Sequence, residues 1–451
     1  MKARIGILLL MFLSGWVNAQ QHLPDSIVIA LKTANNDSLI YDANHQANLY
    51  FEEINKDSAL YYNERCLSLA KKDNKKLVLA RCLASKGYQL TGKGQYAEAL
   101  KNLLEAFAIA EDPKNASNSW FTTNGWLTKR PSPEQTRIFV LALTHHMYAI
   151  LMHATQNTQQ QVIHFKEARR LAKSINNIPR VMLADMNLGQ TYATLNKIDS
   201  ASMFLKEAKE MTIQFGPRKY LSYILMNLGD IAQKRGNKTN AKQLYYEGIS
   251  SALDQKSRIT LTWLYLTLAD VYLGEKQKDS SLYFARKAFE TFNTLGGYSG
   301  EPVNIGSVYQ KLYDSYQLRG QRDSAYKYSG LALAAKEKIN ATRIKNLAQF
   351  QSLSLKEQLR LQDLEKEKEV YQSQVRTYAL VTGLGVFLII GIILWRNNQK
   401  QKQTNLLLSE QKEEISAQRD NLEHQNHELE IEAALERVRA RTMAMCIRVT
   451  N

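Results

Sequence analysis

The chain has few of the side chains from which enzyme sites and disulfide frameworks are built. Cysteine occurs three times in 451 residues, and none directly follows the apolar N-terminal run, so a lipoprotein anchor is not expected. The motifs of phosphate-binding loops, zinc proteases, serine hydrolases and protein kinases are also missing. We therefore expect a protein that is not an enzyme and that holds no cofactor.

Acidic residues are fewer than basic ones. The chain has 59 Lys and Arg against 43 Asp and Glu, a formal net charge of +16. From Arg396 onward the two signs balance, so the basic excess lies before that residue. A basic surface attracts an anionic polymer or membrane over only about 10 Å at physiological salt. Because no nucleic-acid-binding motif accompanies the charge, we interpret it as a solvated basic face and expect no nucleic acid partner.

The first 19 residues have the pattern of a secretory signal peptide. Positive charge in MKAR precedes nine apolar residues, IGILLLMFL, and the small residues of Val17-Asn18-Ala19 suit cleavage before Gln20. Nine residues of helix rise only about 14 Å, which is too short to cross a bilayer. We predict that 1–19 is a signal peptide, that 20–39 is a lead-in, and that the chain from residue 20 onward is exported.

A second apolar run, residues 378–395, has eighteen residues without a charge. As a helix it rises about 27 Å, which is close to the hydrocarbon thickness of a bilayer. Tyr378 and Trp395 stand at its two edges, and a basic flank follows. Because highly charged stretches lie on both sides, we interpret the run as a transmembrane helix rather than a buried core helix. The predicted topology is single-pass, with 20–377 outside and 396–451 inside.

Small residues recur with a fixed spacing between residues 40 and 338. One small residue is followed by a second after twelve positions and by a third after seven more, which allows two helices to approach closely. Clear copies are Gly87/Ala99/Ala106, Gly189/Ala201/Ala208, Gly229/Ala241/Gly248 and Ala269/Ser281/Ala288. Looser copies bring the number to seven, and most steps are 40 residues long. The pattern predicts an all-α solenoid of paired helices.

A turn signal separates the two helices of several copies. NKDSA (55–59), KIDSA (197–201), QKDSS (277–281) and QRDSA (321–325) place an aspartate at one position of the repeat. We expect these residues, Asp57, Asp199, Asp279 and Asp323, to be N-caps of the second helices.

These repeats resemble the tetratricopeptide repeat. Its signature of Leu-Gly, Tyr, Ala, an aromatic residue and Ala is matched by Leu188-Gly189, Tyr192, Ala201, Leu205 and Ala208. The 40-residue step exceeds the usual 34, so longer helices or longer connections are expected. The resemblance implies that the first helix of each pair lines a concave wall that binds a protein or peptide partner. It maps onto that wall Asn187, Gln190, Asn227, Asp230, Asp270 and Asp314, the last three as an acidic stripe.

One insertion, residues 111–135, interrupts the regular step and contains Trp120, Phe121 and Trp126. A long loop in a solenoid often reaches over a binding face. The other interpretation, which we favour, is that the aromatic side chains fill a join between two parts of the array.

Histidine and cysteine supply further candidates. His146 and His153 are two helical turns apart on the expected concave stripe, but no third ligand has suitable spacing, so we expect polar lining and no metal. Cys66 and Cys82 lie at the end of one copy and the start of the next, in an exported segment where a disulfide can form. Because Cys66 occupies a small-residue core position, two buried thiols are favoured over a disulfide.

Long helices are predicted on both sides of the apolar run 378–395. Residues 339–377 contain neither Pro nor Gly and form a predicted helical stalk. Beyond the run, Leu408, Ile415, Leu422 and Leu429 repeat every seven residues, and a seam in another phase follows. One apolar stripe in every heptad indicates a partner helix, so we predict a parallel homodimer with coiled-coil-like contacts. The alternative is a lone solvated helix.

The cytoplasmic segment Leu406–Met445 resembles the juxtamembrane helix of membrane sensor proteins of Bacteroidetes-type bacteria. The similarity is carried by NLLLSEQKEEISAQRDNLEHQNHELEIEAALERVRARTMAM (405–445). In that family exported tetratricopeptide repeats precede one membrane helix, and the equivalent segment leads into an output domain, often a histidine kinase. CIRVTN (446–451) departs from the family pattern, so we expect a truncated chain or one whose output is supplied by a partner.

The resemblance implies a periplasmic sensor anchored in the bacterial inner membrane. Its repeats would bind a protein or peptide and relay the event through the stalk and the membrane helix to the cytoplasmic helix. The alternative is a membrane-anchored scaffold for protein–protein interaction with no signalling role. Long phased helices on both sides of the membrane favour the sensor.

Overall fold

The computed structural model describes residues 23–52, 54–120, 131–216, 218–295 and 303–449. All regular elements in these ranges are helical, and a short helix, α2 (Asp25–Thr33), precedes seven helix pairs. The pairs are α3 (Asp37–Phe51) with α4 (Lys56–Lys72), α5 (Lys76–Gly92) with α6 (Tyr96–Glu111), α7 (Pro133–Ala154) with α8 (Thr158–Ser174), α9 (Ile178–Thr194) with α10 (Ile198–Gln214), α11 (Leu221–Lys234) with α12 (Lys238–Asp254), α13 (Arg258–Gly274) with α14 (Lys278–Asn293), and α15 (Ile305–Arg319) with the start of α16 (Arg322–Val449). Two short 3-10 helices, η1 (Pro113–Asn115) and η2 (Arg218–Tyr220), lie in connections.

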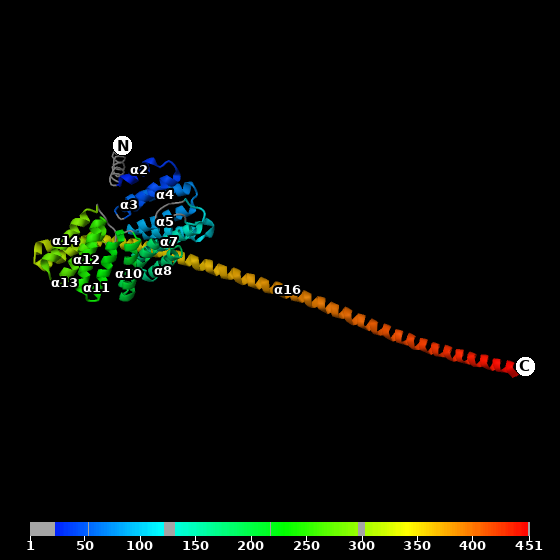
Figure 1. Cartoon of the computed structure of the whole chain (residues 1–451). Coiled ribbons are helices and arrows are strands. Elements are labelled where there is room, and N and C mark those ends of the chain that lie inside the picture. Colours follow the sequence, from blue (N-terminus) through cyan, green and yellow to red (C-terminus); the bar gives the residue numbers. More distant parts are fainter. Residues whose placement is uncertain (1–22, 53, 121–130, 217, 296–302, 450–451) are drawn as a thin grey trace. The chain divides into compact units, whose positions relative to one another are not determined.

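The chain divides into two units, Met1–Glu357 and Gln358–Asn451. In the first unit the two helices of each pair from α3–α4 to α13–α14 contact each other, and the second helix of each of these pairs contacts the first helix of the next pair. Figure 1 shows the pairs succeeding one another in chain order, from blue α3–α4 to yellow-green α13–α14. The predicted all-α solenoid is therefore confirmed.

Longer helices account for the 40-residue step. The helices α9, α10, α12 and α13 each have 17 residues. Three-residue connections join α9 to α10, α11 to α12 and α12 to α13, and the middle residue of each has a left-handed backbone, as at Asn196 (φ 57°) and Gly236 (φ 81°). A left-handed residue after the last helical turn ends a helix sharply. The extra residues therefore lie in the helices.

The expectation that the repeated aspartates are N-caps is wrong by two positions. Asp57 is the second residue of α4, and the N-cap is Asn55, whose side chain accepts hydrogen bonds from the amides of Asp57 and Ser58. Before Asp199, Asp279 and Asp323 a left-handed turn residue fixes where the next helix starts, which leaves each aspartate inside the first turn; these turn residues are Asn196, Lys276 and Gly320. The carboxylates instead reach the next helix pair. Asp57 pairs with Lys93, Asp199 with Arg235 at 2.7 Å and Asp279 with Arg319 at 3.1 Å.

The repeated small residues lie where two helices meet. A Cβ atom on Gly189 of α9 would stand 2.5 Å from Cγ of Leu205 on α10, and Gly87 of α5 has the same relation to Leu103 of α6 at 2.6 Å. Ala201 and Ala208 are fully buried. The predicted role of the small residues in close helix packing is therefore confirmed.

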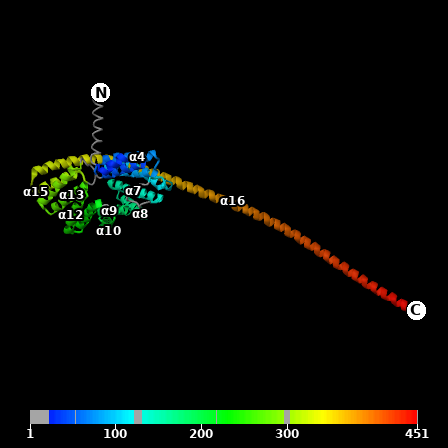
Figure 2. The same ribbon diagram turned by 45° about the horizontal axis from the view of Figure 1, so that its top comes forward.

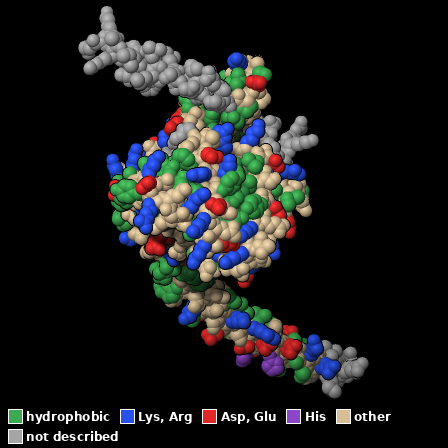
Figure 3. All heavy atoms as spheres, turned by 90° about the vertical axis from the view of Figure 1, so that its left-hand side faces the viewer, with side chains coloured by type: hydrophobic (Ala, Val, Ile, Leu, Met, Phe, Trp, Pro, Cys, Tyr) green, Lys and Arg blue, Asp and Glu red, His purple; other side chains and the backbone are tan. Residues whose placement is uncertain are grey.

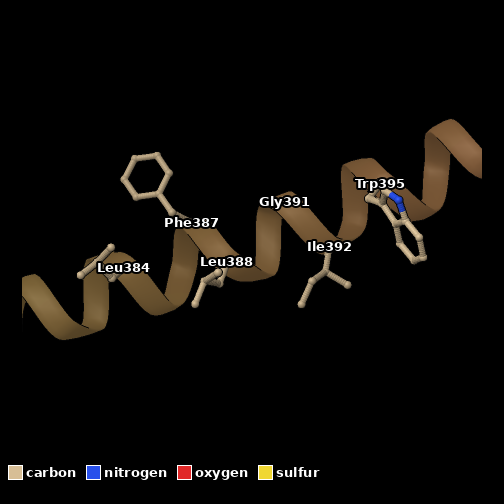
Figure 4. Close-up of a pocket in the computed structure, with 6 residues that line it drawn as sticks. All are labelled: Leu384, Phe387, Leu388, Gly391, Ile392 and Trp395. Atoms are coloured by element: carbon tan, nitrogen blue, oxygen red, sulfur yellow. The ribbon is translucent and has the colours of Figure 1, made fainter.

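Helix α16 is 128 residues long. Its start completes the seventh pair, with Ala325 and Ala332 buried and Tyr328 stacked on Tyr316. Figures 1 and 2 draw α16 as one continuous helix. Within the described residues it is the one helix long and apolar enough to cross a membrane, with a mean hydropathy of 2.3 over its most apolar 18 residues. Figure 4 shows part of the run 378–395, with Leu388 and Ile392 on one side of the helix and Phe387 on the other.

Candidate partner-binding surface of the helical repeats

Two of the predicted wall residues meet across adjacent first helices. Nδ2 of Asn187 on α9 lies 3.3 Å from Nε2 of His146 on α7. His146 is 4 % exposed, and its burial, with the charge of Arg180 adding, lowers its pKa to about 3. The ring is therefore neutral at physiological pH. His153 is exposed near the end of α7, so the structure does not bring it to His146.

The asparagines at one repeat position are each anchored to their own helix. Asn187 donates to the carbonyl of Leu183 and Asn227 to that of Tyr223, both at 2.8 Å. Gln190 is half-buried one turn further along α9. Asn187 and Gln190 therefore present half-buried amide groups on α9, whereas Asn227 on α11 is buried.

The three aspartates of the predicted acidic stripe have different surroundings. Asp230 accepts a hydrogen bond from Oη of Tyr245 at 2.7 Å, and burial raises its pKa to about 6 against the opposing effects of that bond and of Lys234. Asp270 is exposed and forms an ion pair with Lys311. Nζ of Lys311 also lies 3.8 Å from Oδ2 of Asp314. One lysine therefore joins two of the three carboxylates.

The described start of the insertion packs against the N-terminal pairs. The indole of Trp120 is half-buried, with its ring 5.5 Å from that of Tyr41 on α3. The Asn118 carbonyl accepts from the amide of Leu77 at 3.0 Å, at the start of α5. Trp120 thus supports the favoured interpretation, in which the aromatics fill a join. Phe121 and Trp126 lie outside the described residues.

Cys66 and Cys82 are both free and buried. The Cys66 thiol donates to the backbone carbonyl of Tyr41 at 3.7 Å. A hydrogen bond with Cys82, together with burial, raises the pKa of Cys66 above its ordinary value. The Cys66 thiol is therefore protonated, and both side chains are shielded from solvent in this structure.

A cationic cluster on the first helices was not predicted. Nη2 of Arg81 on α5 lies 2.7 Å from Nε2 of His45 on α3, and the guanidinium groups of Arg81 and Arg180 lie 5.7 and 5.1 Å from the ring of Phe139. Burial lowers the pKa of Arg180 to about 10, so this side chain stays charged at neutral pH. Burial, reinforced by both arginines, holds the pKa of His45 well below its usual range. The two arginines occupy different repeat positions, so no periodic signal marks them.

Two more histidines form an aromatic cluster between α6, α7 and α8. Nδ1 of His145 lies 2.9 Å from Nδ1 of His164, and the ring of Phe107 lies 4.7 Å from that of His145. Burial, with the neighbouring His164, lowers the pKa of His145 to about 4. No group of three His, Cys, Asp or Glu side chains within the described ranges is placed to hold a metal ion.

No protein-family model and no curated protein matches the chain. Among solved structures, the chain is similar to a Rap protein complexed with competence and sporulation factor, with a TM-score of 0.48, 14% identity, and coverage of 69% of this chain and 79% of that one. It is also similar to aspartyl phosphate phosphatase F from Bacillus subtilis, with a TM-score of 0.45, 14% identity, and coverage of 73% and 80%. A tetratricopeptide repeat protein from Parabacteroides merdae has a TM-score of 0.40, 15% identity, and coverage of 68% and 98%. Because these scores lie below 0.5, the fold assignment depends on the helix pairs described above.

Proposed function

We propose that the chain is a single-pass sensor of a bacterial inner membrane, whose periplasmic helical repeats bind a protein or peptide and relay that event to a cytoplasmic helix. The relay needs a partner that prefers one of two helix arrangements, as any coupling does. We further propose that the repeats act by binding rather than by catalysis.

The observation that carries the proposal is the continuity of α16. The helix begins as the second member of the seventh pair and includes the apolar run 378–395 and the heptads beyond it. The sequence has no proline after Pro302, and proline is the commonest cause of a sharp helix kink. A movement of the seventh helix pair would therefore be transmitted to the apolar run 378–395 along one helix, α16.

A second copy of the chain is the proposed partner of the cytoplasmic helix. Leu408, Ile415, Leu422 and Leu429 are each at least half exposed and lie on one heptad stripe. A parallel coiled coil would bury that stripe, and a weak seam suits helices that change register.

Protease treatment of spheroplasts tests the topology. Trypsin added outside should remove the repeats and leave the apolar run with the cytoplasmic helix protected. Cleavage of the cytoplasmic helix with the repeats intact would contradict the proposal. Permeabilised spheroplasts, in which both parts should be cut, serve as the control.

Capture from periplasmic extract tests the binding role. The full chain, solubilised in a mild detergent, should retain a partner. The double substitution Asp270→Ala with Asp314→Ala should weaken this capture, because the two carboxylates beside Lys311 belong to the proposed acidic stripe. Asp254→Ala, at an exposed end of the second helix α12, is the matched control. Equal capture by both variants would remove these carboxylates from the proposed site.

A further inference from the structure

Helix α16 keeps one buried face after the seventh pair has ended. Cδ1 of Ile339 still faces α15, at 3.8 Å from where a Cβ atom on Gly306 would stand. Residues 340–342 are exposed. From 343 to 357 the buried or half-buried side chains then follow a spacing of three and four residues, namely Arg343, Asn346, Leu347, Phe350, Leu353, Ser354 and Glu357. All other side chains of this docked segment, residues 343–357, are exposed.

The docked segment packs on helix pairs that lie far earlier in the chain. Phe350 is 6 % exposed and belongs to the apolar cluster built mainly from α4 to α7, and Leu347 and Leu353 pack against the same cluster. In Figures 1 and 2 the yellow part of α16 passes beside these N-terminal pairs.

Polar residues of the segment meet the same pairs. Nδ2 of Asn346 lies 3.5 Å from where a Cβ atom on Gly94, in the α5–α6 turn, would stand. Burial raises the pKa of Tyr148 on α7, and the charge of Glu357 raises it further. In a simple solenoid each repeat contacts only its neighbours. Here the helix that leaves the last pair also contacts the second and third pairs.

We propose that the docked segment is a releasable latch on a helix-binding surface of the second and third pairs, and that the partner of the array is an amphipathic helix that takes its place. The inference rests on the proposed function, in which the repeats bind a protein or peptide. The present occupant defines the partner's chemistry. It presents an aromatic side chain at the centre and leucines three residues to either side, with Asn and Ser at the rim.

The contacts and the composition of the docked segment suit its replacement by another helix. Phe350 is its one buried apolar side chain, while Leu347 and Leu353 are half-buried. A few anchors at helical spacing are typical of a helix that binds another protein's surface. The segment contains no proline or glycine and includes three Leu, two Gln and two Lys, which are good helix formers, so it remains a good helix when released. A competing helix restores the lost contacts, and its binding frees the helix that leads to the apolar run.

A fluorescent peptide of residues 340–360 is the direct probe, and the full chain in detergent micelles is the target. The Phe350→Ala chain should bind this peptide at least tenfold more tightly than the wild-type chain, because its own latch competes less. Leu355→Ala, at a 58 % exposed leucine on the opposite face, should bind it as the wild type does. A peptide carrying Phe350→Ala should not bind. Equal binding by the wild-type and Phe350→Ala chains, or binding by neither, would overturn the latch.

A second measurement does not depend on the folding of the Phe350→Ala chain. A cysteine at the half-buried position in Ser354→Cys should react slowly with a maleimide in the otherwise wild-type chain and faster when excess peptide is added. Mass spectrometry separates this site from the native cysteines. An unchanged labelling rate would refute displacement. Conversion of dimers into monomers by the peptide would also refute a latch within one chain, because the segment would then come from a second copy.

The latch and the proposed function can fail separately. A periplasmic partner that is captured and is not displaced by the peptide would overturn the latch alone. Peptide exchange in a chain whose repeats are cut only from the cytoplasmic side would support the latch and overturn the proposed function.

Discussion

Replacement of Gly229 by alanine should destabilise the repeats although alanine is the better helix former. A Cβ atom at this position of α11 would stand 2.5 Å from Cε1 and 2.8 Å from Cδ1 of Tyr245 on α12. The ring has little freedom to move, because Tyr245 is fully buried and its Oη lies 2.7 Å from Oδ1 of Asp230 and 3.0 Å from Oε1 of Gln233.

The expected change in the free energy of unfolding is the balance of one stabilising and two destabilising effects. Alanine in place of glycine stabilises a helix interior by about 1 kcal/mol. An added methyl group in a packed core costs about 1–3 kcal/mol. Displacement of the ring would also weaken its hydrogen bond to a carboxylate, which contributes about 1.5–3 kcal/mol. We therefore expect the local free energy of unfolding around Gly229 to fall by about 1–3 kcal/mol.

Hydrogen–deuterium exchange of the full chain, followed by mass spectrometry of α11 and α12, measures this local stability. Since 1.4 kcal/mol corresponds to a factor of ten, the protected amides should exchange about five- to 150-fold faster. Gly330→Ala is the matched control, because Gly330 is an exposed residue of α16 with no atom within 4 Å of an added Cβ atom. That variant should exchange more slowly around its site. Slower exchange in Gly229→Ala as well would show that the close contact with Tyr245 does not limit the packing.

Three further outcomes are expected from chemical unfolding of the full chain. Arg169→Met should lower the free energy of unfolding by about 3 kcal/mol at pH 7.5, because it leaves the fully buried Asp185 carboxylate without its ion pair. Burial raises the pKa of Asp185 to about 6, so this carboxyl is mostly neutral at pH 5 and the loss should be smaller there. Burial likewise raises the pKa of Asp230 to about 6, so its stabilising contribution is present below about pH 4 and is lost as pH rises through 6. Asp230→Asn should remove this loss of stability, which is at most about 3 kcal/mol. A pH profile of stability equal to that of the wild type would contradict the raised pKa of Asp230. Asp199→Ala should change stability by less than about 1 kcal/mol, and less still in high salt, because its pair with Arg235 is exposed; a larger loss would mean that the pair is shielded from solvent.

Charge could be assessed from the sequence only as a total. The basic excess was interpreted as a solvated face, and Figure 3 shows Lys and Arg side chains dispersed over one face of the repeats among apolar and acidic ones. The acidic stripe was placed from repeat position alone. The repeat position of a residue indicates which wall its side chain faces but not which side chains surround it. It therefore does not reveal the hydrogen bond from Tyr245 to Asp230 or the ion pairs of Lys311 with Asp270 and Asp314.

The sequence alone determined the helix pairs, because a small residue is needed wherever two backbones approach, and that need recurs at every step of 40 residues. It also determined the apolar run 378–395, since length and composition suffice for it. Only the tertiary structure decided where each second helix starts, which cations meet at Phe139, and that residues 343–357 lie on the second and third pairs. The physical reason is distance along the chain. A repeat pattern encodes contacts within a pair and with the next pair, whereas Phe350 meets residues more than 190 positions earlier through the summed rotation of all the pairs between them.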